Sequence, residues 1–135
     1  MQNHHLMARW VWVTLCCIGL LGSTPGMALA KPWQITHPDN GANYTFTADI
    51  SCDGEGPDEM GSESTSYILQ LEQRIAGNPP TVNVLQSTSG ECAAESWTDE
   101  ITNPESADWP HNQTLYLALY SGGAEKTSIT IDITN

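Results

Sequence analysis

Strict alternation of apolar and polar side chains is the feature that most constrains the fold of this 135-residue chain. In residues 44–52 Tyr, Phe, Ala, Ile and Cys alternate with Thr, Asp and Ser, and the same period of two recurs in residues 115–120 and 129–133. Successive side chains of a β-strand point to opposite faces of its sheet, so a period of two is typical of strands. The segments after residue 30 have no convincing helical period. The sequence therefore predicts an all-β fold.

The pattern predicts seven short strands in the second part of the chain. They lie around residues 33–37, 44–52, 67–71, 82–84, 97–101, 115–120 and 129–133. Turn-forming residues separate them, for example in Pro38-Asp39-Asn40-Gly41 and in residues 121–125. Strands at this spacing are typical of an immunoglobulin-like (Ig-like) sandwich of about seven antiparallel strands. We predict that residues 31–135 form one such domain.

The first thirty residues are predicted to be an export signal. Arg9 supplies a positive charge, residues 10–21 form an apolar run, and Ala28-Leu29-Ala30 has the small-x-small pattern of a cleavage site. The alternative is a membrane anchor, but the run has 12 residues, whereas a spanning helix needs about 20. We predict a Sec-type signal peptide over residues 1–30, cleavage after Ala30, and a secreted or periplasmic mature chain without a membrane span.

The charge balance excludes several classes of partner. The chain carries 16 acidic and 4 basic side chains, a formal net charge of −12. A nucleic-acid reader needs a basic patch to displace counterions from phosphates, and an anionic lipid surface repels an acidic protein. We therefore expect a protein or polysaccharide partner outside the cytoplasm.

The cysteines are interpreted from the predicted export. Two of the four, Cys16 and Cys17, leave with the signal, so Cys52 and Cys92 remain. Outside the cytoplasm a remaining pair most simply forms one disulfide, here with both residues at the same end of the sandwich. The alternative is a pair of free, buried thiols. Neither residue has a second Cys or His at the spacing of zinc ligands.

A family resemblance rests on the two ends of the mature chain. The opening Ile35-Thr36-His37-Pro38-Asp39-Asn40-Gly41 is similar to the I-x-x-P-x-x-G start of many bacterial Ig-like domains of extracellular and cell-envelope proteins. Ser96-Trp97, the run Leu115-Tyr116-Leu117-Ala118-Leu119-Tyr120, the Gly-Gly after it and the closing Ile-x-Ile-x-Ile strand resemble the second half of the same family. The resemblance implies a binding, spacing or cell-surface role. Residues 115–120 hold no cysteine, unlike the corresponding strand of antibody domains.

Catalytic signatures are lacking in the mature sequence. It has no nucleophile elbow, Ser-x-x-Lys, His-Glu-x-x-His or glycine-rich phosphate loop. His37 and His111 each stand beside a proline in a predicted loop, where a solvated histidine is ordinary. We predict that the protein is not an enzyme and needs no cofactor, apart from a calcium ion considered next.

Five carboxylates crowd the loop after the second predicted strand. They are Asp53, Glu55, Asp58, Glu59 and Glu63. Hard oxygen ligands on a glycine-rich backbone suit Ca²⁺, and extracellular modules bind it at about 0.1–1 mM. The spacing differs from that of an EF-hand loop, so the alternative is an acidic, solvated loop.

Aromatic residues suggest a second kind of binding site. Trp109 between Asp108 and Pro110 is expected to be exposed, and Tyr116 and Tyr120 lie opposite the leucines of their strand. Exposed aromatic faces stack on sugar rings, so these three residues are a candidate carbohydrate platform. The alternatives are that the tyrosines simply cover a sheet face, or that Tyr116 forms a tyrosine corner. We predict that Trp97 lies in the core.

The leading prediction is an exported, non-enzymatic Ig-like module with a binding or structural role in the cell envelope or extracellular space. A Ca²⁺-binding module and a carbohydrate-binding module are the alternatives.

Overall fold

The computed structural model describes residues 30–58, 64–104 and 108–135. These residues form eight strands and no helix. The strands are β1 (Gln34–His37), β2 (Ala42–Thr45), β3 (Ile50–Glu55), β4 (Ser66–Ile75), β5 (Thr81–Glu91), β6 (Ser96–Ile101), β7 (Gln113–Ser121) and β8 (Ala124–Thr134). The all-β prediction is confirmed. The predicted export signal lies outside the described residues, apart from Ala30.

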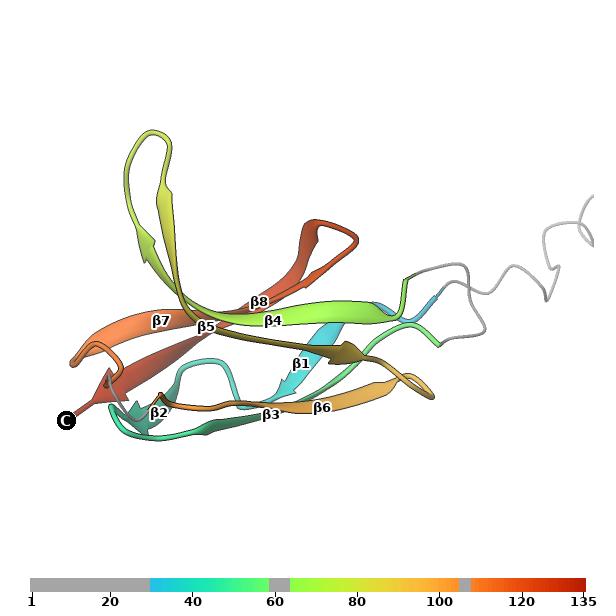
Figure 1. Cartoon of the computed structure of the whole chain (residues 1–135), viewed down its shortest axis with the longest axis horizontal. Helices are drawn as coiled ribbons and strands as arrows, with labels where there is room; N and C mark the ends of the chain where they lie inside the picture. The colour runs from blue at the N-terminus through green and yellow to red at the C-terminus, as the bar shows by residue number, and fades with distance from the viewer. Residues whose placement is uncertain (1–29, 59–63, 105–107) are drawn as a thin grey trace, which may run out of the picture.

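The strands form two open sheets. One sheet has three strands in the order β1-β3-β6, and the other has five in the order β2-β8-β7-β4-β5. All pairs are antiparallel except β2 with β8, which is parallel. Figure 1 shows the two sheets as two layers, with β3 and β6 below β4, β7 and β8. Among the described residues no helix has the length and hydropathy of a membrane span.

The strand predicted over residues 44–52 is wrong in one respect, because the chain changes sheets within it. Tyr44 pairs with Ile133 in the five-stranded sheet, whereas Ile50 pairs with Ile101 in the three-stranded sheet. A turn lies between them, in which the Ala48 amide donates to the Thr45 carbonyl at 3.1 Å. Tyr44 and Ile50 both turn toward the protein interior from opposite layers. The alternation is therefore preserved across the crossing, so the period alone could not reveal it.

The core between the layers draws on both sheets. From the three-stranded layer come Trp33, Ile50, Cys52, Trp97 and Ile101, and from the five-stranded layer Tyr67, Leu69, Leu71, Leu115, Leu117, Leu119, Ile131 and Ile133. Two glycines of the smaller sheet make room for its indoles. A Cβ on Gly54 would overlap the Trp97 ring, and a Cβ on Gly56 would lie 2.7 Å from the Trp33 ring. The predicted core position of Trp97 is confirmed.

The predicted disulfide is not formed in the structure, in which Cys52 and Cys92 are buried free thiols. Cys92 lies against Gly56, since a Cβ on that glycine would be 3.1 Å from the Cys92 sulfur. Cys52 stands four residues earlier in the chain, and at about 3.3 Å per extended residue that offset is about 13 Å. Disulfide-linked Cα atoms are at most about 7 Å apart. Cys92 thus lies beside the residue that follows β3, whereas Cys52 lies within the strand, and the two thiols are not joined.

The strands predicted at residues 67–71 and 82–84 are parts of two longer strands, β4 and β5, which pair as a long hairpin. β4 and β5 pair from Ser66 with Glu91 out to Ile75 with Thr81. The register shifts after Leu71, because Leu71 pairs with Gln86 while Glu72 pairs with Val84. This β-bulge leaves Leu85 unmatched, and a bulge bends and twists its strand.

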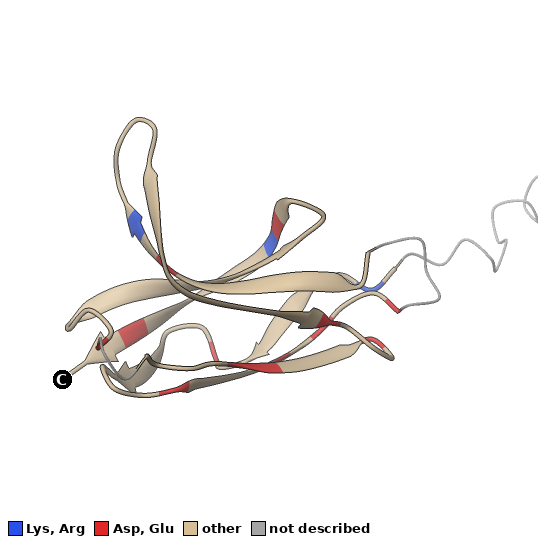
Figure 2. Cartoon of the chain, viewed as in Figure 1, with Lys and Arg blue, Asp and Glu red and all other residues tan. Residues whose placement is uncertain are grey.

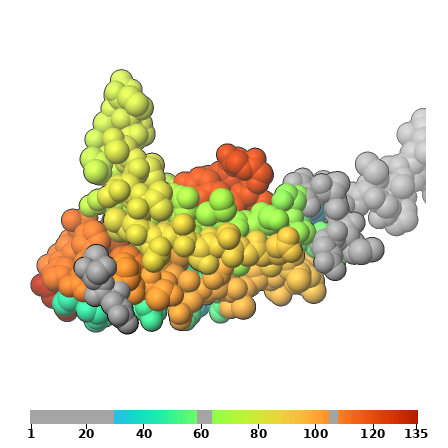
Figure 3. All heavy atoms as spheres, in the orientation of Figure 1, coloured from blue at the N-terminus to red at the C-terminus, as the bar shows by residue number. Residues whose placement is uncertain are grey.

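Beyond the bulge the β4–β5 ribbon leaves the two layers. We call residues 73–84 the arm; Figure 1 shows it rising away from the sheets, and Figure 3 shows it standing clear of the body in space-filling view. Every residue from 75 to 84 is exposed. The described residues thus form a packed body from which the arm projects, and the shorter β7–β8 hairpin rises from the same side of the body (Figure 1).

Candidate interaction surface

The arm carries exposed apolar side chains near its base and along β5. Ile75 is 50% exposed, Val82 48% and Val84 45%. Glu72 pairs with Val84 and Arg74 pairs with Val82, and directly opposed residues of an antiparallel pair share one face. Ile68 of β4, 46% exposed, lies on the same face, six residues before Arg74. Exposed apolar groups that share a face are typical of an interaction surface.

A buried carboxylate holds the root of the arm. The Glu72 side chain has no solvent exposure, which is costly for a charged group unless it is paired and hydrogen-bonded. The Tyr120 hydroxyl donates to Glu72 Oε2 at 2.6 Å, and Arg74 Nε donates to Glu72 Oε1 at 3.0 Å. Both oxygens of the buried carboxylate are therefore satisfied.

Arg74 connects the root to the neighbouring hairpin. Its guanidinium forms ion pairs with Glu72 and with Glu125 of β8, and it lies 4.4 Å from the ring centre of Tyr116. A guanidinium over a ring at this distance is a cation–π contact. We call Glu72, Arg74, Tyr116, Tyr120 and Glu125 the root cluster. Its single guanidinium pairs with both carboxylates, and these contacts fix the point at which the arm begins.

The root cluster raises the pKa of Tyr120. Burial, followed by the hydrogen bond to Glu72, raises the pKa of Tyr120 to about 12. The hydroxyl therefore stays protonated through the neutral range and remains a donor to Glu72.

The predicted carbohydrate platform is not assembled. Tyr116 and Tyr120 lie in the root cluster and are half-buried. Trp109 is only 2% exposed, so the expectation of an exposed Trp109 is wrong. Its indole Nε1 donates to the Ala48 carbonyl at 2.8 Å, and its amide donates to the Phe46 carbonyl at 2.9 Å. These bonds hold Trp109 beneath the crossing between β2 and β3, where its ring serves the core.

The acidic loop is described only in part. Glu59 and Glu63 lie outside the described residues. Asp53 accepts a hydrogen bond from Thr98 at 2.6 Å, and Glu55 forms an ion pair with Lys31 at 3.3 Å. Asp58 follows β3 and is half-buried.

Within residues 30–58, 64–104 and 108–135 no group of three His, Cys, Asp or Glu side chains could hold a metal ion. Calcium binding by the whole loop stays a prediction.

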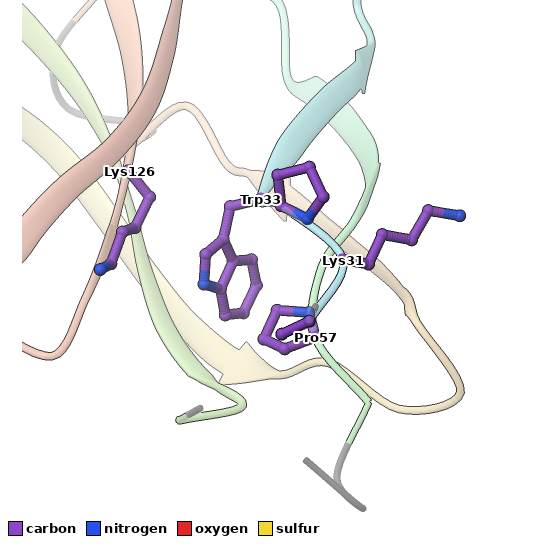
Figure 4. Close-up of a pocket in the computed structure, with 6 residues that line it drawn as sticks. Lys31, Trp33, Pro57 and Lys126 are labelled. Carbon is purple, nitrogen blue, oxygen red and sulfur yellow. The ribbon is translucent and has the colours of Figure 1, made fainter. Parts of the chain in front are cut away.

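One cavity of about 250 Å³ lies at the start of the described chain. Trp33, Pro57 and Lys126 line it together with Lys31, and Figure 4 shows Lys126 extending beside the Trp33 indole while Lys31 extends away from it. Lys31 is occupied by ion pairs with Glu55 and Glu95 at 3.3 and 3.6 Å. The cavity thus offers a ligand the ammonium group of Lys126 and the edge of the mostly buried Trp33 ring. These two groups are too few to define a specific binding site.

Sequence reasoning missed the arm and its root cluster. The sequence predicts Tyr116 and Tyr120 as surface candidates but gives no sign of Glu72, the acceptor of the Tyr120 hydroxyl, because a glutamate in a strand is expected to face solvent. A usable signal was the spacing of Glu72 and Arg74, two residues apart in a strand and therefore on one face. A second signal was the uncharged stretch over residues 75–90 in so acidic a chain.

Comparison with known proteins adds no relative. No family model, curated protein or solved structure matches this chain.

Proposed function

We propose that the protein is an exported, non-enzymatic Ig-like module that binds a protein partner through its arm. The observation that carries this proposal is the arm itself, whose residues 75–84 are all exposed and include Ile75, Val82 and Val84. An extended ribbon with apolar side chains and free backbone groups suits recognition of another chain. The body acts as the scaffold that presents it.

The strand order supports the Ig-like part of the proposal. In Ig-like sandwiches the first, second and fifth strands share one sheet, and the third, sixth and seventh share the other. The order β1-β3-β6 fits the first group, and the run β8-β7-β4-β5 fits the second with β5 added at its edge. The short β2 then corresponds to a first strand that switches sheets to pair in parallel with β8.

The binding role is supported by the chemistry that the surface offers. Hydrogen bonding and ion pairing already engage Glu72, Arg74 and Glu125 with one another. The arm beyond them offers only neutral side chains and backbone, which can bind but cannot transfer protons near neutral pH. The export signal predicted over residues 1–30 supports a location outside the cytoplasm.

The test places a photo-crosslinking amino acid at Val82 in the full chain, expressed in cells that naturally export it. The matched control carries the same group at Ser51, which is exposed on β3 in the other sheet. We expect a discrete adduct from position 82 and none from position 51, because only the arm contacts the partner. Equal labelling at both positions, or none at position 82, would contradict the proposal.

A further inference from the structure

We propose that the arm's partner is a second copy of this chain, and that the two copies pair through the edge of β5 in an antiparallel, twofold-symmetric manner. This inference rests on the proposed function and names its partner. Its basis is the combination of a free strand edge, exposed valines and the absence of charge along that edge.

The four edge strands of the two sheets differ in what they expose. β1 and β2 have four residues each, and β6 carries Asp99 and Glu100. β5 has 11 residues, and its only charged residue is Glu91 at the end. Natural sheet edges are usually protected against pairing by short length or by charge. β5 carries fewer charges than β6, and its residues 81–84 differ from the short edge strands β1 and β2 because they stand clear of the body (Figure 3).

A short part of β5 is free to accept another strand. The side chains of Gln86 and Thr88 bond across to the other sheet, to the Thr102 carbonyl at 3.1 Å and to Asp99 at 3.1 Å. The bulge at Leu85 separates that part from residues 81–84, which lie in the arm. Within the described chain these four residues have β4 as their only strand neighbour. Residues 81–84 are therefore the pairing segment.

The charge distribution favours a second copy over a charged partner. Residues 75–90 contain no Asp, Glu, Lys or Arg, while the whole chain has a net charge of −12. Figure 2 shows the arm beyond Arg74 without a charged residue. A basic partner would be attracted to the acidic body. The uncharged arm offers such a partner no carboxylate with which to form an ion pair. Two acidic copies repel each other, and they approach with the least repulsion through segments that are neutral and far from the body.

Twofold pairing also matches the side chains. In an antiparallel pair around a twofold axis the same face of each strand joins into one continuous face. Val82 and Val84 lie on one face of β5, since they are two residues apart. Pairing therefore brings four valines together and shields groups that are nearly half exposed in the single chain.

The test measures self-association of the exported full chain by sedimentation velocity across a concentration series. We expect a monomer–dimer equilibrium whose association constant rises at least about threefold as ionic strength rises from about 20 to about 300 mM, because salt screens the repulsion between copies. A monomer at every concentration up to about 1 mM and at both ionic strengths overturns the inference.

Two matched variants locate the contact. Val82→Glu adds a charge beside the twofold axis and should weaken association at least about tenfold. Ile68→Glu adds the same charge at 46% exposure on β4, which is not an edge strand, and should change association by less than about threefold. Thermal melts check that both variants fold, and Val84→Glu is the substitute for Val82→Glu.

The outcomes separate this inference from the proposed function. Association that survives Val82→Glu, or that Ile68→Glu weakens equally, overturns pairing through β5. In the crosslinking experiment an adduct of twice the chain mass supports a second copy. An adduct with a different protein retains the proposed function and overturns the inference, and no adduct at position 82 overturns both.

Discussion

The two halves of the β4–β5 ribbon have similar secondary structure and opposite surroundings. On the body side of the bulge, Leu69 and Leu71 are completely buried between the sheets. On the far side, Ile75, Val82 and Val84 are about half exposed. The same two strands therefore supply part of the core and, a few residues later, the most exposed apolar surface of the described chain.

The difference shows that a short polar segment can divide a ribbon into a buried half and an exposed half. The β-bulge at Leu85 turns the ribbon, and the root cluster around Glu72 fixes the direction in which it leaves the body. The free-energy cost of burying the Glu72 carboxylate is offset there, because Tyr120 and Arg74 donate hydrogen bonds to its two oxygens. The predictions below test this division, beginning with the largest effect.

Truncation on the two sides of the bulge should differ most. Leu71→Ala removes a fully buried side chain and should lower the free energy of unfolding by about 3 kcal/mol. Val82→Ala, on the exposed arm, should change it by less than about 0.5 kcal/mol. Urea unfolding followed by tryptophan fluorescence measures both values. Similar losses for the two variants would mean that the arm packs against something in the isolated chain.

Removal of the buried carboxylate should have the next largest effect. Glu72→Ala leaves the Tyr120 hydroxyl without its acceptor and Arg74 with Glu125 alone, so we expect a loss of about 2 kcal/mol. Glu125→Gln is the control, because that carboxylate is partly exposed and its replacement should cost less than about 1 kcal/mol. A Glu72→Ala variant as stable as the wild type would contradict the account of the root cluster.

The body should lose stability in alkaline solution. Burial, and after it the charge of Asp99, raises the pKa of Cys52 from 9.0 to about 12. The folded chain keeps this proton where the unfolded chain has lost it, so the free energy of unfolding falls as pH rises from about 9 to about 12. The loss should reach about 1 kcal/mol at pH 10.

Cys52→Ala supplies the control for the alkaline effect. The decline between pH 8 and pH 10 should be smaller in this variant than in the wild type, and the part that remains should include Tyr120, whose pKa is also raised. An equal decline in both chains would exclude Cys52 as a cause.

The smallest expected effect is on mass. Because Cys92 lies beside Gly56, four residues beyond Cys52, the purified chain should have the same intact mass with and without reductant. A mass lower by about 2 Da before reduction would show a disulfide and contradict the separation of the two thiols.

The sequence was sufficient where the signal is local. Alternation correctly predicted the all-β class and the interiors of β7 and β8. In each of these strands the apolar residues of the buried face stand at every second position. The sequence was insufficient where a residue far away in the chain determines whether a side chain is buried. The Ala48 carbonyl, 61 residues away, holds Trp109 in the core, and Tyr120, 48 residues away, makes burial of Glu72 acceptable. The chain changes sheets near Ala48 without interrupting the alternation of apolar and polar residues. The alternation therefore cannot predict this change.

Amide hydrogen exchange at low and high protein concentration tests the division of the ribbon most directly. Amides of Leu69 and Leu71 should be protected at every concentration, because both residues are fully buried. Amides of residues 81–84 should exchange rapidly when dilute and become protected as the concentration rises, because the second copy then covers the edge of β5. Protection of residues 81–84 that does not change with concentration, or that appears instead on the three-stranded sheet, would contradict the account.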